Sequence, residues 1–235
     1  MLIISNGVPK SGSSYLFKLQ RDLIEASTES ENQVTTAIYE GEINGHGLFI
    51  SDLNDHSFSI LRDISEKYGP LVIKVHDKNA SKIQKYASRK NVYSTFTYRD
   101  PRCFILSAMD HKERTKNEQQ QVFPQFTNVT SAIPEAKSWG GIALQFKKSE
   151  IFTLKYEDLV ISPEYCVGKV AKYLNVKINE KRILAVCAKE KNERKVGAIQ
   201  FNKGIVTRYD KEMTSGEIKE CDEAMSEVLD LLGYT

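Results

Sequence analysis

Near its start the chain reads Leu2-Ile3-Ile4-Ser5-Asn6-Gly7-Val8-Pro9-Lys10-Ser11-Gly12-Ser13-Ser14-Tyr15. The apolar run that ends at Asn6-Gly7 is typical of a strand, and the apolar spacing from Ser13 to about Ala26 indicates a helix. A loop between a strand and a helix offers backbone N–H groups and a helix N-terminus, both of which favour an anion. The stretch therefore predicts a phosphate-binding loop at the start of an α/β fold.

This loop has the glycine spacing of a P-loop but lacks the lysine of one. Four residues separate Gly7 from Gly12, and Ser13 stands where a nucleotide triphosphatase has its lysine. The lysine of this loop is Lys10, inside it. Such a loop suits a phosphate-like group but not magnesium-bound ATP. The alternative is a tight turn whose glycines supply positive φ angles.

The rest of the chain alternates between strand and helix patterns. Further strands are predicted at 71–75, 92–98 and 151–154, and helices at 57–68, 80–88, from 101, at 163–174, about 179–191 and 216–232. This alternation predicts an α/β fold: a single-domain three-layer sandwich over residues 1–235, with a mostly parallel central sheet. The weakly periodic stretch Asp110–Ser138 is expected to be a functional or disordered loop, and one that shapes acceptor specificity.

Composition narrows the classes of function. With 33 basic and 31 acidic residues the net charge is +2, so no overall field attracts nucleic acid or a membrane. No segment has the length of a membrane span, and the isolated cysteines indicate reduced thiols, so we expect a cytoplasmic protein. The four histidines are far apart, so no metal site is expected. The histidines are His46, His56, His76 and His111, and the cysteines are Cys103, Cys166, Cys187 and Cys221.

Two further strands end in charged residues. The strand 71–75 leads into Lys74-Val75-His76, and alternation along the strand points Lys74 and His76 to the same side. Ligand sites of open parallel sheets lie beyond the carboxyl ends of strands, so a cation and a general base are expected together there. The alternative is a surface lysine and histidine at a strand end.

The strand 92–98 ends at Arg99, and Ser107 follows two helical turns later. A guanidinium at a strand end is suited to bind a phosphate through two parallel hydrogen bonds. The alternative is that Arg99 forms a salt bridge with Asp100 or Glu157.

Five segments, in order along the chain, resemble motifs of the PAPS-dependent sulfotransferases, where PAPS is 3′-phosphoadenosine-5′-phosphosulfate. Pro9–Tyr15 resembles the phosphosulfate loop PKSGTTW, and Lys74–His76 resembles the K-T-H strand end. Tyr98–Arg102 with Ser107 resembles the 3′-phosphate motif R-N-P-x-D with its later serine. Leu154–Leu159 resembles the segment L-x-Y-E-D-L, and Phe201–Gly204 with Tyr209 resembles the segment F-R-K-G…W.

The resemblance implies a role for each matching residue. Lys10, Lys74 and His76 would be catalytic, with His76 as the general base. The nucleotide, as PAPS or as the product adenosine 3′,5′-bisphosphate (PAP), would be bound by Lys10, Ser11, Gly12, Ser13, Ser14, Tyr15, Arg99, Ser107, Tyr156, Asn202, Lys203 and Gly204. No metal is implied.

The chain also departs from the family pattern. Tyr15 replaces a tryptophan, Val75 replaces a threonine, and Asn202 replaces an arginine, which removes one cation near the 3′-phosphate. The adenine-contacting element is expected near Cys187–Lys189.

The resemblance implies a sulfotransferase that moves a sulfuryl group from PAPS to a hydroxyl or amine acceptor and releases PAP. The acceptor, a small molecule or a carbohydrate, and the oligomeric state stay open. Two alternatives remain: a P-loop kinase acting on a small molecule, and a non-catalytic nucleotide-binding module. Preference for PAP over ADP would separate the first from a sulfotransferase.

Overall fold

A computed structural model describes residues 1–27, 45–46, 48–117, 122–195 and 204–235. The strands are β1 (Leu2–Gly7), β2 (Gly45–His46), β3 (Phe49–Ile50), β4 (Leu71–Lys74), β5 (Val92–Tyr98) and β6 (Phe152–Lys155). The helices are α1 (Ser13–Ser27), α2 (Asp55–Tyr68), α3 (Ala80–Ala87), α4 (Pro101–Arg114), α5 (Val129–Lys148), α6 (Tyr156–Ile161), α7 (Pro163–Tyr173), α8 (Glu180–Lys195), α9 (Tyr209–Glu212) and α10 (Ser215–Leu232). Within these residues no helix is long and apolar enough to cross a membrane.

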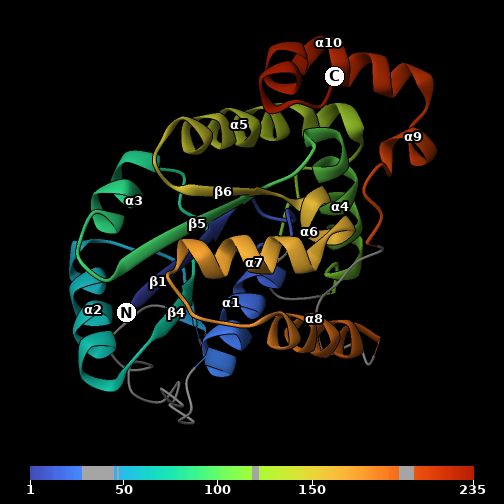
Figure 1. Ribbon diagram of the computed structural model, residues 1–235. Helices are drawn as coiled ribbons and strands as arrows, with labels where there is room; N and C mark the ends of the chain where they lie inside the picture. Colours follow the sequence, from blue (N-terminus) through green and yellow to red (C-terminus); the bar gives the residue numbers. More distant parts are fainter. Residues whose placement is uncertain (28–44, 47, 118–121, 196–203) are drawn as a thin grey trace.

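The sheet places the phosphate loop at its centre. Its strand order is β2-β3-β4-β1-β5-β6, and every neighbouring pair is parallel except β2 and β3. The chain leaves β1 for α1 between β4 on one side and β5 on the other (Figure 1). This is the point where an open α/β sheet binds its ligand. The predicted mostly parallel sheet is confirmed.

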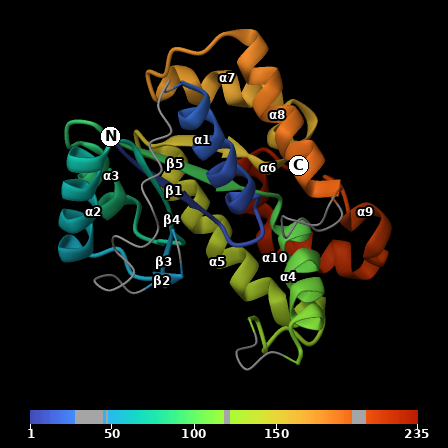
Figure 2. The same ribbon diagram turned by 90° about the horizontal axis from the view of Figure 1, so that it is seen from below.

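Helices cover both faces of the sheet, which makes three layers. Alternating residues of β1 divide between two cores: Leu2 and Ile4 belong to the core that includes residues of α5 and α10, whereas Ile3 belongs to the core that includes residues of α1, α7 and α8. Figures 1 and 2 show α5 and α10 together on one side of the sheet and α1, α7 and α8 on the other. The predicted three-layer α/β sandwich is therefore confirmed.

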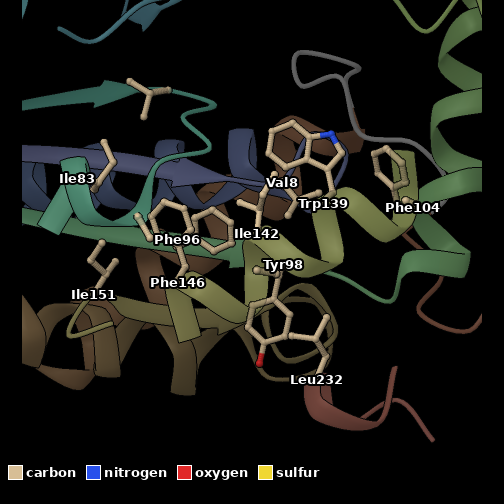
Figure 3. Packing of buried hydrophobic residues seen from close by; sticks show 14 of the residues in the cluster. Val8, Ile83, Phe96, Tyr98, Phe104, Trp139, Ile142, Phe146, Ile151 and Leu232 are labelled. Carbon is tan, nitrogen blue, oxygen red and sulfur yellow. The ribbon is translucent and has the colours of Figure 1, made fainter. Parts of the chain in front are cut away.

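The prediction for Asp110–Ser138 is partly wrong, because regular helices occupy both ends of this stretch. Helix α4 continues to Arg114, and α5 begins at Val129, where Asn128 and Ser131 cap its first turn reciprocally. Helix α5 packs on the sheet through Phe146, whose ring stacks on Phe96 at 3.9 Å between centroids (Figure 3). Residues 118–121 lie outside the described part of the chain.

Candidate active site

The phosphate loop is fixed to the ends of the neighbouring strands. The Oδ1 atom of Asn6 accepts from the N–H of Gly7 at 2.8 Å and from that of Asp77, just after β4, at 3.0 Å. On the other side, the Val8 N–H donates to the Thr97 carbonyl of β5 at 2.9 Å. Glycine is required at position 7 because a Cβ there would lie 2.1 Å from the hydroxyl oxygen of Thr97. The loop is thus held by three strands at once.

Two residues of the loop adopt left-handed backbone conformations. Lys10 has a φ of 63° and Gly12 a φ of 77°. A Cβ on Gly12 would lie 2.7 Å from Cδ2 of Tyr156, so this aromatic ring closes directly against the loop. A non-glycine residue such as Lys10 at positive φ is uncommon and costs about 1–3 kcal/mol, and such residues gather at functional sites.

Ser11 does not face the ligand side of the loop as expected. Its hydroxyl lies 2.6 Å from the Val8 carbonyl, 3.0 Å from the Thr97 carbonyl and 2.9 Å from the Thr97 hydroxyl. Its N–H donates to the Val8 carbonyl at 3.2 Å. The residue is fully buried, so it braces the loop against β5.

Two lysines from different elements meet at the mouth of the loop. Lys74, the last residue of β4, donates from Nζ to the hydroxyl of Ser14 on α1 at 2.8 Å. Burial lowers the pKa of Lys74 to about 8. Burial also lowers the pKa of Lys10 to about 8, with further contributions from neighbouring cations, Arg114 first among them. Burial is the main cause in both cases, and an anion bound beside the two ammonium groups would favour their charged forms.

His76 is held in one tautomer by the backbone of the loop. Its Nδ1 atom lies 2.7 Å from the carbonyl oxygen of Gly7, and a carbonyl can only accept, so Nδ1 carries the proton. Burial and then the charge of Lys74 lower the pKa of His76 to about 4. At neutral pH the ring is therefore uncharged, and the lone pair on Nε2 is available to accept a proton.

Arg99 is buried and lies between the loop and a later segment of the chain. Its guanidinium donates to the carbonyls of Lys10 at 3.5 Å and Ile205 at 2.9 Å, and its Cζ lies 4.2 Å from the ring centroid of Tyr156. Within the described residues it makes no ion pair, and its buried Nε has no hydrogen-bond partner. The alternative of a salt bridge with Asp100 or Glu157 is therefore wrong. Asp100 forms an ion pair with Arg102, and Glu157 accepts a hydrogen bond from the Tyr234 hydroxyl.

One cavity of about 390 Å³ collects most of the predicted residues. It is lined by Pro9, Lys10, Gly12, Ser13, Ser14, Tyr15, Phe49, Lys74, His76, Arg99, Ser107, His111, Val122, Phe123 and Tyr156. Of the remaining predicted residues, Gly204 is not in this lining but directly precedes Ile205, whose carbonyl accepts from Arg99. Asn202 and Lys203 lie outside the described residues.

The residues near Cys187–Lys189, where the adenine-contacting element is expected, are not part of the lining of this cavity. Cys187 is buried in the core on the α1 side of the sheet, and Lys189 forms an ion pair with Asp22 at 2.6 Å. Neither residue lines the cavity.

Sequence reasoning missed part of the cavity wall. Phe49, from the short strand β3, packs against His76 at 5.6 Å between ring centroids and lies under the Lys74 ammonium at 5.2 Å. On the opposite wall, His111 is on α4, one turn beyond Ser107, and it belongs to the stretch Asp110–Ser138 that is expected to shape acceptor specificity. Phe49 lies in no recognisable motif of the sequence.

The chemistry of the cavity is that of an anion site beside a proton acceptor. Lys10, Lys74 and Arg99 contribute positive charge, and no aspartate or glutamate is present in the lining found among the described residues. His111 adds a second imidazole, whose pKa is lowered by burial and by Lys10. No group of His, Cys, Asp and Glu suited to a metal ion occurs in the described part of the chain.

Comparison with known proteins matches this chain to one family. The model of the sulfotransferase domain matches residues 2–233. No curated protein matches the sequence. Among solved structures, mouse sulfotransferase SULT7A1 complexed with PAP is similar, with a TM-score of 0.67, 15% identity and coverage of 100% of this chain and 89% of that one.

Two further structures share the fold. Retinol dehydratase, solved with androsterone and the inactive cofactor PAP, gives a TM-score of 0.56 at 12% identity, covering 97% of this chain and 80% of its own. The sulfotransferase domain from the curacin biosynthetic pathway gives 0.52 at 14% identity, covering 100% and 98%. At such identities these structures establish the architecture alone.

Proposed function

This chain belongs to the sulfotransferase domain family, and on that premise we propose that it transfers a sulfuryl group from PAPS to a hydroxyl or amine acceptor and releases PAP. The observation that carries the proposal is the cavity that Lys10, Lys74 and Arg99 line together with a neutral His76. We further propose that residues 1–235 act as one sulfotransferase domain. The cytoplasmic location stays a prediction.

The residues of the cavity fit the nucleotide. The buried Nε of Arg99 has no partner among the described residues, and the lining offers no carboxylate to neutralise the lysines. An anion with several phosphate oxygens would give the Arg99 Nε a hydrogen-bond acceptor and would neutralise the charge of the lysines. Arg99 and Ser107 would hold the 3′-phosphate, and the loop with Lys10 would hold the phosphosulfate.

The side chains divide the chemistry among them. PAPS, when bound, supplies the sulfuryl group and a phosphate leaving group. Lys10 and Lys74 stabilise negative charge that develops on oxygen, and a preorganised cation in a site that excludes water is effective in this role. His76 accepts the acceptor's proton at Nε2, because Nδ1 is committed to Gly7. General-base catalysis of this kind contributes about 10²–10⁴-fold in rate.

The two alternatives fit less well. A P-loop kinase needs a lysine directly after the second glycine, and Ser13 occupies that position. A binding module without turnover has no use for a histidine held in one tautomer beside two lysines. The acceptor is proposed as a small molecule or a carbohydrate.

Nucleotide preference tests the donor side. We expect PAP to bind in the presence of EDTA and more tightly than ADP with magnesium. Arg99→Ala should weaken PAP binding by about 10–100-fold, because a charge-assisted hydrogen bond contributes about 1.5–3 kcal/mol. The affinity for AMP, which lacks the 3′-phosphate, should change little in the same variant. Equal losses for the two nucleotides in calorimetry would contradict the assignment of Arg99.

Transfer itself is tested with a panel of phenols, alcohols, amines and sugars. Each is incubated with PAPS, and mass spectrometry follows the sulfated product together with PAP. Stoichiometric formation of both is expected for at least one acceptor class. Tight PAP binding without transfer to any of them would favour the non-catalytic module.

A further inference from the structure

Outside the cavity, a closed ring of hydrogen bonds connects α4 to the segment after α10. Glu157 accepts from the backbone N–H of Asp100 through Oε1 at 3.3 Å and from the hydroxyl of Tyr234 through Oε2 at 2.8 Å. Arg102 closes the ring, because its Nη2 donates both to the Tyr234 carbonyl at 2.7 Å and to Oδ2 of Asp100 at 2.8 Å. Two separate routes therefore join Tyr234 to Asp100.

This ring lies directly behind the nucleotide side of the cavity. Asp100 follows Arg99 in the chain, and Glu157 follows Tyr156, so the hydrogen bond from the Asp100 N–H to the Glu157 side chain links the two segments that carry Arg99 and Tyr156. The neighbouring side chains, Arg99 and Tyr156, stack at 4.2 Å and both line the cavity. The position of Arg99 over the tyrosine ring thus depends on how Glu157 is held.

Tyr234 is well placed to hold Glu157. Burial raises the pKa of Glu157, and hydrogen bonds from the Tyr234 hydroxyl and the Asp100 N–H act in the opposite direction. Burial and the Glu157 charge raise the pKa of Tyr234, so its hydroxyl stays a donor. The Tyr234 ring is itself fixed by the Lys155 ammonium at 4.4 Å and by an edge contact with Tyr98 at 6.4 Å.

We propose that Tyr234 is a positioning residue of the nucleotide site, which acts through Glu157 to hold Arg99 against Tyr156 for recognition of the 3′-phosphate. The inference rests on the proposed function, because Arg99 needs this phosphate as its ligand. Tyr234 touches no reacting group. It sets the affinity for the nucleotide and leaves the chemical step to other residues.

The test replaces Tyr234 by phenylalanine, which removes one hydroxyl and keeps the ring. Loss of one hydrogen bond to a carboxylate should weaken PAP binding by about five- to tenfold, whereas AMP binding should change by less than about twofold. In turnover the KM for PAPS should rise by a similar factor and kcat should hold. Glu157→Gln should reproduce the shift, and Tyr234→Phe should add nothing further in that background, because the two residues act in series.

Lys147→Met is the matched control, because Lys147 holds the end of α10, directly before this segment, through the Leu231 carbonyl at 2.9 Å but takes no part in the ring. It should leave PAP affinity unchanged. If Tyr234→Phe keeps the wild-type preference for PAP over AMP, or if its effect adds fully to that of Glu157→Gln, Tyr234 does not position Arg99, although the proposed function stands. If the wild-type protein shows no preference for PAP, the proposed function and this inference fail together.

Discussion

At the scale of residues, two histidines line one cavity, but their surroundings fit them for different work. His76 is oriented by the Gly7 carbonyl, which leaves Nε2 without a proton. His111 is half-buried on α4, and no described residue forms a hydrogen bond with its ring. A base must be held in the right tautomer and orientation before its pKa matters. His76 meets this condition, and His111 does not.

His76→Ala should therefore lower kcat by about 10²–10⁴-fold while PAP affinity is retained, because the lysines and Arg99 remain. His111→Ala is the comparison and should have a much smaller effect on kcat. Since the pKa of His76 is lowered to about 4, kcat/KM should stay level well below pH 6.5 and fall as the pH approaches 4. A kcat/KM that already falls near pH 6.5, or a larger loss of kcat in His111→Ala than in His76→Ala, would show that His76 is not the base.

At the scale of elements, the connection from α4 to α5 supplies one wall of the cavity and part of the core. Phe123 lines the cavity and stacks on Phe126 at 5.1 Å between centroids, with a φ of 64°. Phe126 is 2% exposed and Val129 4%, so both are core residues. Replacing all of Val122–Val129 by a flexible linker would damage the core. Changing Phe123 alone separates specificity from stability.

Phe123→Ala should raise acceptor KM by about tenfold, because a half-buried aromatic wall contributes roughly 1–2 kcal/mol. PAP affinity should hold, since no nucleotide-binding role is assigned to this side chain. Phe126→Leu is the control: it should lower the free energy of unfolding by about 1 kcal/mol and leave acceptor KM unchanged. An unchanged KM in Phe123→Ala across true acceptors would show that this connection does not shape specificity.

Local pattern explains which elements could be predicted. The strands β1 and β4 could be read because short apolar runs end in polar residues, and β5 because it is rich in β-branched and aromatic residues. Lys10, Lys74 and Arg99 lie at or just beyond these strand ends. Helix α5 could not, because Pro134 and Gly140-Gly141 interrupt its pattern, and its apolar face is defined by packing on the sheet. Ser11 occupies a position in the loop motif that predicts a ligand donor. Its burial against Thr97 could not be predicted, because it depends on how β1 pairs with β5.

At the scale of the whole molecule, the strand order joins residues that are far apart in sequence. Strand β1 lies between β4 and β5, so the loop after β1 meets Lys74 on one side and Arg99 on the other. No segment contains this site by itself. Because Lys10 and Lys74 share one buried cavity, their protonation is linked both to ligand binding and to global unfolding.

This linkage predicts how pH affects PAP binding. In the free protein both lysines have a pKa of about 8, below the ordinary 10.5, so above pH 8 they lose protons that an unfolded chain keeps. A phosphate ester titrates near pH 6 and is fully charged there, so bound PAP should draw protons back onto the lysines. The association constant should therefore fall above pH 8, by up to about tenfold per pH unit for each lysine.

Calorimetry near pH 8.5 in two buffers with different ionisation enthalpies measures this proton uptake directly. Lys74→Arg is the matched variant, because a guanidinium stays charged and should remove the share of the uptake that belongs to Lys74. The rise in Tm caused by PAP should shrink in parallel as the pH increases, since the free protein gains stability there while the complex does not. Binding that takes up no protons at this pH would mean that neither lysine meets the phosphates.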